Sequence, residues 1–543
     1  MRLLVSLSIL STVIFSCSTF ESKPPISVDT ILHNGVVCTV DSGFTMAEAI
    51  AIDSNGRIAA VGSSSDILDQ YLASNTVDLN GKYVYPGFID AHSHFYGFGK
   101  DLQELDLKSS TSFEDMVNMT VEYAQAKNPS FIIGRGWNEE NWEIKGTISK
   151  FKLDILFPEI PVVLQRVDGH ACLCNQAALD LAGINSKTLV EGGIVEMMGN
   201  FLTGMLIDRA ADLVMDKLPD ASRDQKIAAL VDAQQKCYAA GLTMVTDAGL
   251  DGEIIQLIDS LFNSEVLSIP LYTMANPDSS AIIELLNLNS ERHERHMLTS
   301  VKLYADGALG SRGALLKKPY CDRPDHYGLM QHPVDFYRAY IDFCDRNNLQ
   351  VNTHCIGDSA NKVLLLLYAE RLQGRNDKRW RIEHAQIVDP KDIPLYQDNS
   401  IIPSIQPTHA TSDAKMAQER LCDSETMNGA YIYRTLLDST GLVAFGTDFP
   451  VESIDPLDTY FAAVKRKSKS GMVFKGEEAL TPKQALIGMT RDAAYACRAE
   501  DNYGTIEVGK VASFTILNQD LLAAQERGRV SVHSTYVHGK RVY

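Results

Sequence analysis

The feature that most constrains the fold is a regular alternation of short apolar runs and amphipathic segments through the middle of the chain. The runs have the character of buried strands, and the segments between them, such as Asp224–Ala240 and Asp335–Asn347, have that of helices. Eight runs follow this pattern: Gly87–His92, Leu242–Thr246, Ile269–Met274, Val301–Ala305, Leu349–Thr353, Arg381–His384, Ile401–Ile405 and Val443–Gly446. Eight strands that alternate with helices predict the α/β class and a (β/α)8 TIM barrel, which we place at residues 86–500.

The first two predicted strands are separated by far more chain than one helix requires. The excess is about 140 residues, whereas connections inside a compact domain are normally short. It contains further strand-like segments, among them Phe131–Asn141 and Pro161–Gly183. We therefore expect an inserted cap after strand 1, at about residues 100–235.

Both ends of the chain have the pattern of β structure. Residues 28–85 contain short apolar runs separated by Asn34-Gly35 and Asn55-Gly56, which are strong hairpin signals. Residues 501–543 have a similar texture. Two strand-rich ends on either side of a barrel predict one β-sandwich domain that is formed by both termini.

The charge of the chain excludes one class of partner. There are 69 acidic and 50 basic residues, which gives a formal net charge of −19. Such a surface repels phosphate backbones, so we expect no nucleic-acid partner. The longest apolar stretch, Leu3–Ser16, is too short to span a bilayer.

That apolar stretch has the pattern of an export signal. Arg2 precedes the apolar run, which ends in Ile14-Phe15-Ser16-Cys17, as in a bacterial lipoprotein signal. We predict a signal peptide at residues 1–16, a lipid anchor on Cys17 and a polar tether at residues 17–27. The alternative is an ordinary secretory signal, with Cys17 incidental. The lipoprotein interpretation places the protein outside the cytoplasm, anchored to a membrane of a bacterial cell envelope and facing the periplasm or the cell surface.

Nine cysteines remain when Cys17 is set aside. They are scattered from Cys38 to Cys497 and contain no C-x-x-C motif. We interpret them mostly as small buried apolar residues rather than as a disulfide framework.

Four of the predicted strands end in residue types that bind metal ions. The first strand ends in His92-Ser93-His94, and residues two apart in a strand point the same way. Three other strands end in, or are followed by, His354, His384 and Asp448. In a barrel the carboxyl ends of the strands meet at one face, where active sites form. Imidazoles and a carboxylate gathered there predict a cation.

These residues stand within a longer set of motifs. The motifs are Ala47–Gly62, Pro86–His94, Gly134–Trp137, Asp168–Ala171, Val301–Arg312, His354–Asp358, Arg381–Gln386, Ser404–Pro407, Gly446–Val451 and Gly504–Lys510. Together they resemble the amidohydrolase superfamily, in particular its YtcJ-like branch, amidohydrolase family 3, from about residue 28 to the C-terminus. The resemblance implies a distorted barrel, a β-sandwich built from both termini, and one or two divalent metal ions, usually zinc, in an enzyme that hydrolyses C–N bonds.

The resemblance also implies roles for individual residues. His92, His94 and Asp448 would bind one metal ion, and His354 and His384 would bind the second.

Lys302 matches the strand lysine that carries a CO2-derived carbamate between the two ions. Burial of a charged lysine in an apolar strand is costly, and two cations nearby favour the neutral amine that adds CO2. The alternative is an ammonium group that pairs with Asp306.

Three further residues are candidates for substrate contact. His170 matches a family motif in the cap and would hold the substrate carbonyl or its oxyanion, unless it is a histidine of the cap core. Trp137 would form a pocket wall or simply pack. Arg312 would meet an acidic group of the substrate.

The combined prediction is a metal-dependent amidohydrolase. A metal-bound hydroxide would attack an amide or cyclic amide of a small-molecule substrate, with Asp448 and His170 as the catalytic residues. An esterase, lactonase or deaminase would use nearly the same metal site, and a non-catalytic binding lipoprotein is an alternative of a different class. A homo-oligomer is left open.

Overall fold

The computed structural model describes residues 24–139, 142, 148–166, 171–190, 193–218, 220–288 and 294–543. The signal peptide, Cys17 and His170 lie outside these ranges. Within them, no helix is both long enough and apolar enough to cross a membrane.

The middle of the described chain forms a nearly closed barrel of parallel strands, and this confirms the predicted (β/α)8 fold. The strand order is β21-β20-β19-β18-β17-β16-β15-β8. The chain segments at the ends of the two edge strands are joined by backbone hydrogen bonds, among them one from the amide of Ala91 to the carbonyl of Phe445. The strands are β8 (Phe88–Asp90), β15 (Leu242–Leu250), β16 (Leu271–Ala275), β17 (His296–Tyr304), β18 (Gln350–Cys355), β19 (Arg381–His384), β20 (Ile402–Ile405) and β21 (Ala444–Phe445).

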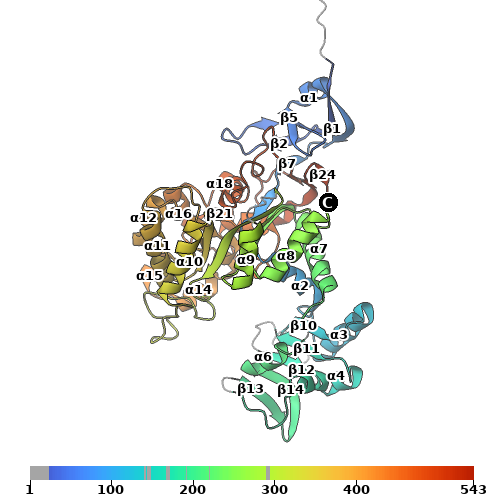
Figure 1. Ribbon diagram of the computed structural model, residues 1–543, viewed down its shortest axis with the longest axis vertical. Helices are drawn as coiled ribbons and strands as arrows, with labels where there is room; N and C mark the ends of the chain where they lie inside the picture. Colours follow the sequence, from blue (N-terminus) through green and yellow to red (C-terminus); the bar gives the residue numbers. More distant parts are fainter. Residues whose placement is uncertain are drawn as a thin grey trace, which may run out of the picture.

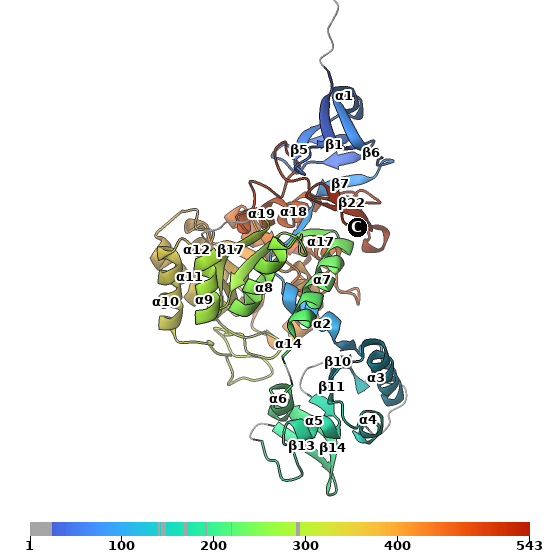
Figure 2. The ribbon, with the colours of Figure 1, turned by 45° about the vertical axis from the view of Figure 1, so that its right-hand side comes forward.

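Helices cover the outside of the barrel (Figures 1 and 2). Their amphipathic spacing explains their position, as in α10, which buries Tyr337, Ile341 and Cys344 along one face. A capping box between Ser222 and Gln225 begins the helix before β15. The outer helices are α7 (Arg223–Ala239), α8 (Gly252–Asn263), α9 (Ser279–Leu288), α10 (Val334–Arg346), α11 (Asp358–Leu372), α12 (Ile393–Asp398), α16 (Tyr433–Thr440) and α17 (Pro456–Lys465).

A second domain joins the two ends of the chain, as expected. β22 from the C-terminal segment pairs antiparallel with β7, so that Ile516 faces Val84. One sheet has the order β24-β23-β22-β7-β2-β3 and the other β5-β4-β1-β6. The strands are β1 (Ile26–His33), β2 (Val36–Cys38), β3 (Met46–Ala47), β4 (Ala49–Ile52), β5 (Ile58–Gly62), β6 (Tyr71–Asp78), β7 (Tyr83–Pro86), β22 (Phe514–Leu517), β23 (Val532–Val537) and β24 (Lys540–Arg541), with α1 (Ser64–Gln70) beside them.

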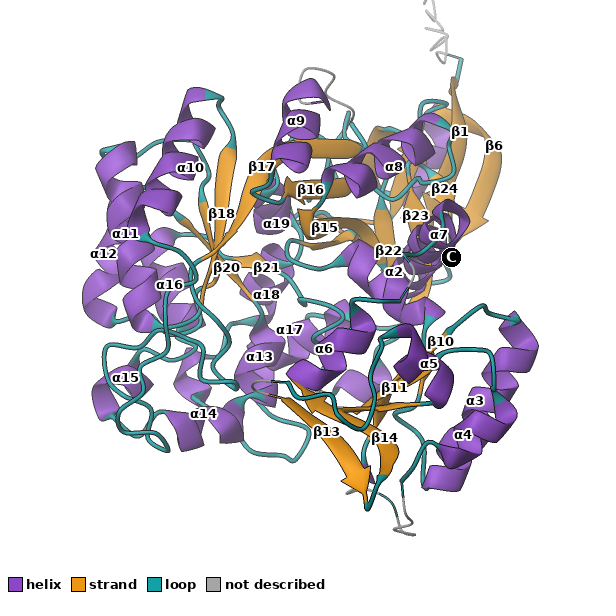
Figure 3. Cartoon of the chain, turned by 60° about the horizontal axis from the view of Figure 1, so that its bottom comes forward, coloured by secondary structure: helices purple, strands orange, loops and turns teal. Residues whose placement is uncertain are grey.

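The predicted cap is a separate layer with its own sheet, ordered β13-β14-β12-β11-β10-β9. It forms a distinct lobe below the barrel in Figure 1, and Figure 3 shows its strands as a group apart from the barrel strands. Its strands are β9 (Leu105–Asp106), β10 (Ile132–Trp137), β11 (Val162–Arg166), β12 (Ala171–Cys174), β13 (Gly193–Met198) and β14 (Phe201–Asp208). Its helices are α3 (Phe113–Lys127), α4 (Phe151–Leu156), α5 (Gln176–Leu181) and α6 (Arg209–Met215).

The cap is shorter at its C-terminal end than the expected residues 100–235. Helix α7 packs against α2 (Phe95–Gln103) and β15 rather than within the cap. It buries Leu230, Ala233 and Cys237, which lie on one helical face. Because this apolar face needs the barrel as its partner, α7 is a barrel helix and the cap elements end at α6.

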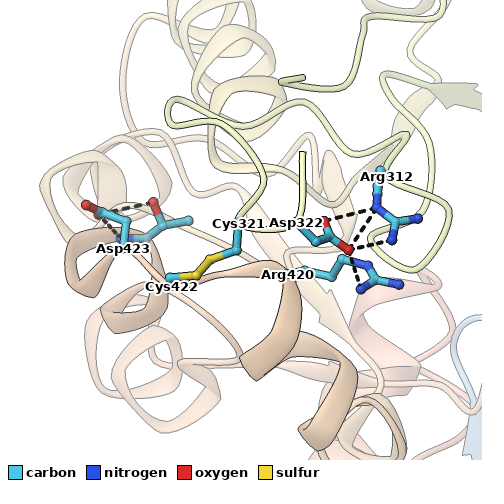
Figure 4. Close-up of a disulfide and its surroundings, with 7 residues drawn as sticks. Arg312, Cys321, Asp322, Arg420, Cys422 and Asp423 are labelled. Carbon is cyan, nitrogen blue, oxygen red and sulfur yellow. Dashed lines mark hydrogen bonds and ion pairs between the residues drawn. A yellow bond between two sulfur atoms is a disulfide. The ribbon is translucent and has the colours of Figure 1, made fainter. Parts of the chain in front are cut away.

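One cysteine pair corrects the interpretation of the cysteines. Cys321, in the loop after β17, forms a disulfide with Cys422, which follows α14 (Ala414–Arg420) and precedes α15 (Ser424–Asn428) (Figure 4). Their Cα atoms are 5.6 Å apart, although the pair is separated by 101 positions in the sequence. The seven other cysteines of the described chain are free and buried, as expected.

Candidate active site

The strand-end histidines and aspartate converge on one point of the barrel. One ligand atom each from His92, His384 and Asp448 lie within 4.8 Å of one another, and all three side chains are buried. Nε2 of His94 lies 3.2 Å from Oδ1 of Asp448. The rings of His354 and His384 are 4.5 Å apart between centroids. The structure therefore brings together all five residues that the strand-end pattern singled out.

The backbone turns sharply where two of these residues leave their strands. His384 has a φ of 73° and Asp448 a φ of 62°, in the left-handed region that non-glycine residues seldom adopt. The amide of Asp448 donates to the carbonyl of His92, which joins the first and last strands at the centre. Gly446 permits this approach, because a Cβ atom there would lie 2.6 Å from the backbone of His92. Such conformations cost about 1–3 kcal/mol each and cluster at functional sites.

Buried partners hold the ligand rings in orientation. Nδ1 of His92 donates to Oε2 of Glu383 over 2.5 Å. Nδ1 of His384 likewise donates to Oε1 of Gln406 over 2.8 Å. In each ring these contacts leave Nε2 as the atom that can face a cation, which is how histidine ligands are normally supported.

The buried negative charge of Glu383 is balanced by Arg381. Nε of Arg381 lies 2.6 Å from Oε1 of Glu383, and both side chains are fully buried. Burial alone would raise the pKa of Glu383, but Arg381 and His92 outweigh it and hold that pKa well below its ordinary value. Glu383 is therefore ionised and accepts a hydrogen bond from Nδ1–H of His92.

Lys302 lies at the same centre. Its side chain is 1% exposed, and its Nζ is 3.2 Å from Nε2 of His92. Burial lowers the pKa of Lys302 to about 8. Asp306, the alternative partner of its ammonium group, instead accepts from the backbone amides of Leu315, Ile356 and Gly357. The structure shows no Lys302–Asp306 ion pair among the described residues.

The donors at this centre fit a divalent cation. Nε2 of His354 is buried and has no hydrogen-bond partner in the described chain, which is unusual for a buried polar atom. Burial would raise the pKa of Asp448, but hydrogen bonding from His94 and the electrostatic influence of the neighbouring histidines hold it well below its ordinary value. Imidazole nitrogens beside an ionised carboxylate are the ligand set of zinc and related metals.

A cavity of about 730 Å³ opens over this cluster. Its floor contains the residues expected to bind metal, and its walls come from the loops that follow β17, β20 and β21. The floor residues are His94, Lys302, His354, His384 and Asp448. A small molecule in this cavity would lie against the predicted centre.

The predicted substrate contacts are placed differently. Trp137 is fully buried, and its Nε1 donates to the carbonyl of Leu164 in the cap core, so it packs rather than lines the cavity. Nε of Arg312 donates to Oδ1 of Asp322 over 3.0 Å, and Arg420 pairs with the same carboxylate (Figure 4). Neither Trp137 nor Arg312 is a lining residue of the cavity. His170 lies outside the described residues.

Sequence reasoning missed three residues near the site, two of which line the cavity. They lie in or next to α13 (Pro407–Ser412), which directly follows β20. Gln406 is the residue before the helix, His409 lies within it, and Asp413 is the residue after it. His409 and Asp413 line the cavity, and Gln406 supports His384. The signal was present, because the strand-end rule that identified His384 also applies to the run that ends at Ile405.

A barrel with imidazoles, a carboxylate and a buried lysine gathered at the carboxyl ends of its strands defines the class of metal-dependent hydrolases. A family model described as the amidohydrolase family matches residues 75–543. The chain belongs to this family, and the resemblance noted from its motifs is confirmed.

Several named relatives align with nearly the whole chain. Protein LONG AFTER FAR-RED 3 of Arabidopsis thaliana is 32% identical over 97% of this chain and 94% of its own. YtcJ of Bacillus subtilis strain 168 is 31% identical, with 94% and 99% covered. The N-substituted formamide deformylase of Arthrobacter pascens is 26% identical, with 94% and 97% covered. A solved structure, an uncharacterized metal-dependent hydrolase from Pyrococcus horikoshii OT3, superposes with a TM-score of 0.77 at 26% identity and covers 92% of this chain and 99% of that one.

Proposed function

We propose that this protein hydrolyses a non-peptide C–N bond, in an amide or cyclic amide of a small molecule. The observation that carries the proposal is the cluster of His92, His384 and Asp448, since His384 and Asp448 also line a cavity large enough for such a substrate. A relative that aligns over most of both chains is named as a deformylase of N-substituted formamides, which is a reaction of this class.

We propose one or two divalent ions, zinc first, as the cofactor. His92, His94 and Asp448 would hold one ion, and His354 and His384 the other, with Lys302 between them as a carbamate. A bound divalent ion supplies Lewis acidity and lowers the pKa of water at the site. The neutral amine that forms a carbamate is favoured by the burial of Lys302, which lowers its pKa.

Asp448 is the proposed proton carrier. Its carboxylate lies between His94 and His409 at the floor of the cavity and is held ionised. It accepts a proton from the attacking water and delivers that proton to the leaving nitrogen, because an amide nitrogen leaves poorly unless it is protonated. His170 stays a proposed contact for the substrate oxygen, on the strength of its sequence motif alone.

We also propose that the protein is exported and anchored by lipid on Cys17. This proposal rests on the sequence of residues 1–27, which combines a basic start, an apolar run and a small residue before Cys17.

A substrate panel with controlled metal content tests the proposed reaction. The protein would be stripped with a chelator, reloaded with zinc, manganese or nickel, and assayed against N-alkyl formamides, cyclic amides, aryl esters, lactones and aminopurines. Metal-dependent release of amine from the amides supports the proposal. Turnover confined to esters, lactones or aminopurines would replace the proposed bond class with one of the alternatives. Metal binding without turnover would favour a binding protein.

A further inference from the structure

A carboxylate with no lysine or arginine partner in the described chain lies on the wall of the active-site cavity. Asp413 caps the end of α13 and lines the cavity. Its Oδ2 accepts from the hydroxyl of Tyr431 over 2.9 Å and from Nε2 of Gln386 over 3.3 Å. Both donors are neutral, and no lysine or arginine of the described chain forms an ion pair with Asp413. Its other oxygen, Oδ1, makes no hydrogen bond in the described chain.

The groups that hold the Asp413 carboxylate are buried and lie next to the predicted metal ligand His384. Tyr431 is fully buried, and its backbone amide donates to the carbonyl of Gln386. Gln386 follows the predicted ligand His384 by two positions and also donates to the Tyr431 hydroxyl over 2.5 Å. Asp413 is thereby fixed through one oxygen by groups that are themselves held in place, which leaves the other oxygen oriented in advance for a ligand.

The charge of the described cavity lining is strongly acidic. It contains Lys302 as its single lysine, contains no arginine, and Lys302 is already engaged beside His92. Its carboxylates are Asp306, Asp413, Asp448 and Glu452. Two of these carboxylates, Asp413 and Glu452, lie outside the proposed metal ligands, so the charge on their part of the wall attracts a cationic group of a substrate.

A second polar group without a hydrogen-bond partner in the described chain, Nε2 of the His409 ring, lies on the same wall beside Asp448. His409 precedes Asp413 by four positions, lines the cavity and is only 7% exposed. Its Nε2 is buried without a hydrogen-bond partner in the described chain and lies 3.7 Å from Oδ2 of Asp448. Buried polar groups are almost always paired, so this atom indicates that a ligand lies along this wall.

We infer that Asp413 binds a positively charged amine at the end of the substrate remote from the bond that is cut. The substrate class is then an amide that carries an ammonium group, and this inference rests on the proposed amide hydrolysis. The ammonium would donate to the open Oδ1 of Asp413, and its hydrocarbon chain would lie on the apolar wall formed by Leu309, Ile356 and Met416. A charge-assisted contact of this kind relieves the cost of an unpaired, half-buried carboxylate. In the free protein, burial raises the pKa of Asp413, as expected for a carboxylate that lacks such a partner.

A matched pair of substrates tests the inference. N-aminopentylformamide and N-hexylformamide have the same length and differ in an ammonium group against a methyl group. The metal-loaded wild-type protein should show a kcat/KM for the ammonium substrate at least about tenfold higher than for the neutral one, because a charge-assisted hydrogen bond to Asp413 forms only with the ammonium group. In Asp413→Asn, which keeps the shape of the side chain, the ratio of the two kcat/KM values should fall towards one.

Glu452→Gln is the matched control. It removes the same charge from the same cavity, at a carboxylate that accepts from the hydroxyl of Ser412. The substrate ratio should stay close to that of the wild type. An equal fall in both variants would show a general field effect and overturn the assignment of Asp413 as the binding residue.

Calorimetry separates this inference from the proposed reaction. Hexylamine should bind the wild-type protein more tightly than hexanol, and Asp413→Asn should remove that difference. If neither formamide is cleaved but the amine still binds through Asp413, the proposed reaction fails and the amine site stands. If the wild-type protein prefers neither the ammonium substrate nor the amine, the inference is wrong even where N-hexylformamide is hydrolysed.

Discussion

His92 and Glu383 meet in the core of the barrel although 291 positions separate them in the sequence. Nδ1 of His92 lies 2.5 Å from Oε2 of Glu383, and neither side chain is exposed. Arg381, two positions earlier in β19, contacts both oxygens of the same carboxylate. The contact selects the tautomer of His92, because a neutral ring that carries its proton on Nδ1 has a free lone pair on Nε2.

Glu383→Gln should weaken both the metal centre and the fold. The ring of His92 loses a charged acceptor, and metal affinity should fall about 10–100-fold. Arg381 is left as a buried charge without its partner, which should lower the free energy of unfolding by about 3–5 kcal/mol. Competition with a chelator measures the first effect and chemical denaturation the second.

The control for this variant is Glu253→Gln, at an exposed carboxylate that pairs with Lys226 on the barrel surface. Such pairs contribute at most about 1 kcal/mol, so neither metal affinity nor stability should change by more than this. A Glu383→Gln protein with the metal affinity and denaturation midpoint of the wild type would show that the contact does not support His92.

Lys302→Ala should reduce the metal content of the protein as well as its activity. If a carbamate on Lys302 bridges the centre, the purified wild-type protein should hold close to two divalent ions per chain, and the variant fewer. A short carboxylic acid should restore part of the activity, because it supplies the missing carboxylate. Lys317→Ala, at a lysine paired with Asp389 and Asp392 away from the centre, should keep the full metal content. One tightly bound ion in a fully active wild-type protein would rule out the bridge.

Asp448→Asn should separate proton transfer from metal binding. The amide keeps an oxygen for weak coordination but cannot cycle a proton. On amide substrates kcat should fall about 10²–10⁴-fold, the usual contribution of general acid–base catalysis, while much of the metal remains. Esters with good leaving groups should lose less, because their leaving oxygen needs less protonation. Near-normal amide turnover with full metal content would mean that another group carries the proton.

Replacement of both Cys321 and Cys422 by serine should destabilise the protein by about 2–4 kcal/mol, since the disulfide closes a long loop of the unfolded chain. The same bond joins the loop after β17 to the α14 region, and both segments line the cavity through residues such as Gly310 and Met416. We therefore also expect a higher KM. Denaturation of the wild-type protein with and without reductant should reproduce the difference. Identical midpoints for the double variant and the oxidised wild type would show that the bond does not stabilise the fold.

Cys17→Ser should abolish lipid attachment and leave the precursor unprocessed or release soluble protein. The purified domain from residue 28 onward should keep its activity, because the tether contains no residue assigned to the site. Labelling with a radioactive fatty acid, followed by membrane fractionation, measures the effect. Membrane association that is unaffected by Cys17→Ser would contradict the lipoprotein interpretation.

The sequence alone was sufficient to predict the barrel and the residues on its floor. The period of apolar runs reports which backbone segments are buried, and each of the eight runs is a strand of the observed sheet. The position of His92, His354 and Asp448 then follows from one geometric rule, because parallel strands in a closed barrel bring their carboxyl ends to the same face. The pattern of apolar runs gives the strands, and the barrel geometry places their carboxyl ends together, so these residues could be grouped without knowing any distance between them.

Contacts between loops and helices were decided by tertiary structure. Arg312 follows the strand motif that begins at Val301, but whether it reaches the cavity depends on Asp322, which lies in the same loop and pairs with it. Trp137 has an apolar ring that either packs or lines a pocket, and the cap sheet covers it. Cys321 and Cys422 lack any spacing signal, since the pairing depends on how the loop after β17 folds back against α14.

The sequence by itself therefore determined what periodicity and strand ends encode: the barrel, the end domain and the metal-binding types of residue at one face. Only the tertiary structure decided which side chains support those residues and which line the cavity, as with Glu383 behind His92 and Asp413 on the cavity wall. The physical reason is that strand order and direction follow from short-range alternation along the chain, whereas the partner of a buried charge depends on atoms that are distant in sequence and close in space.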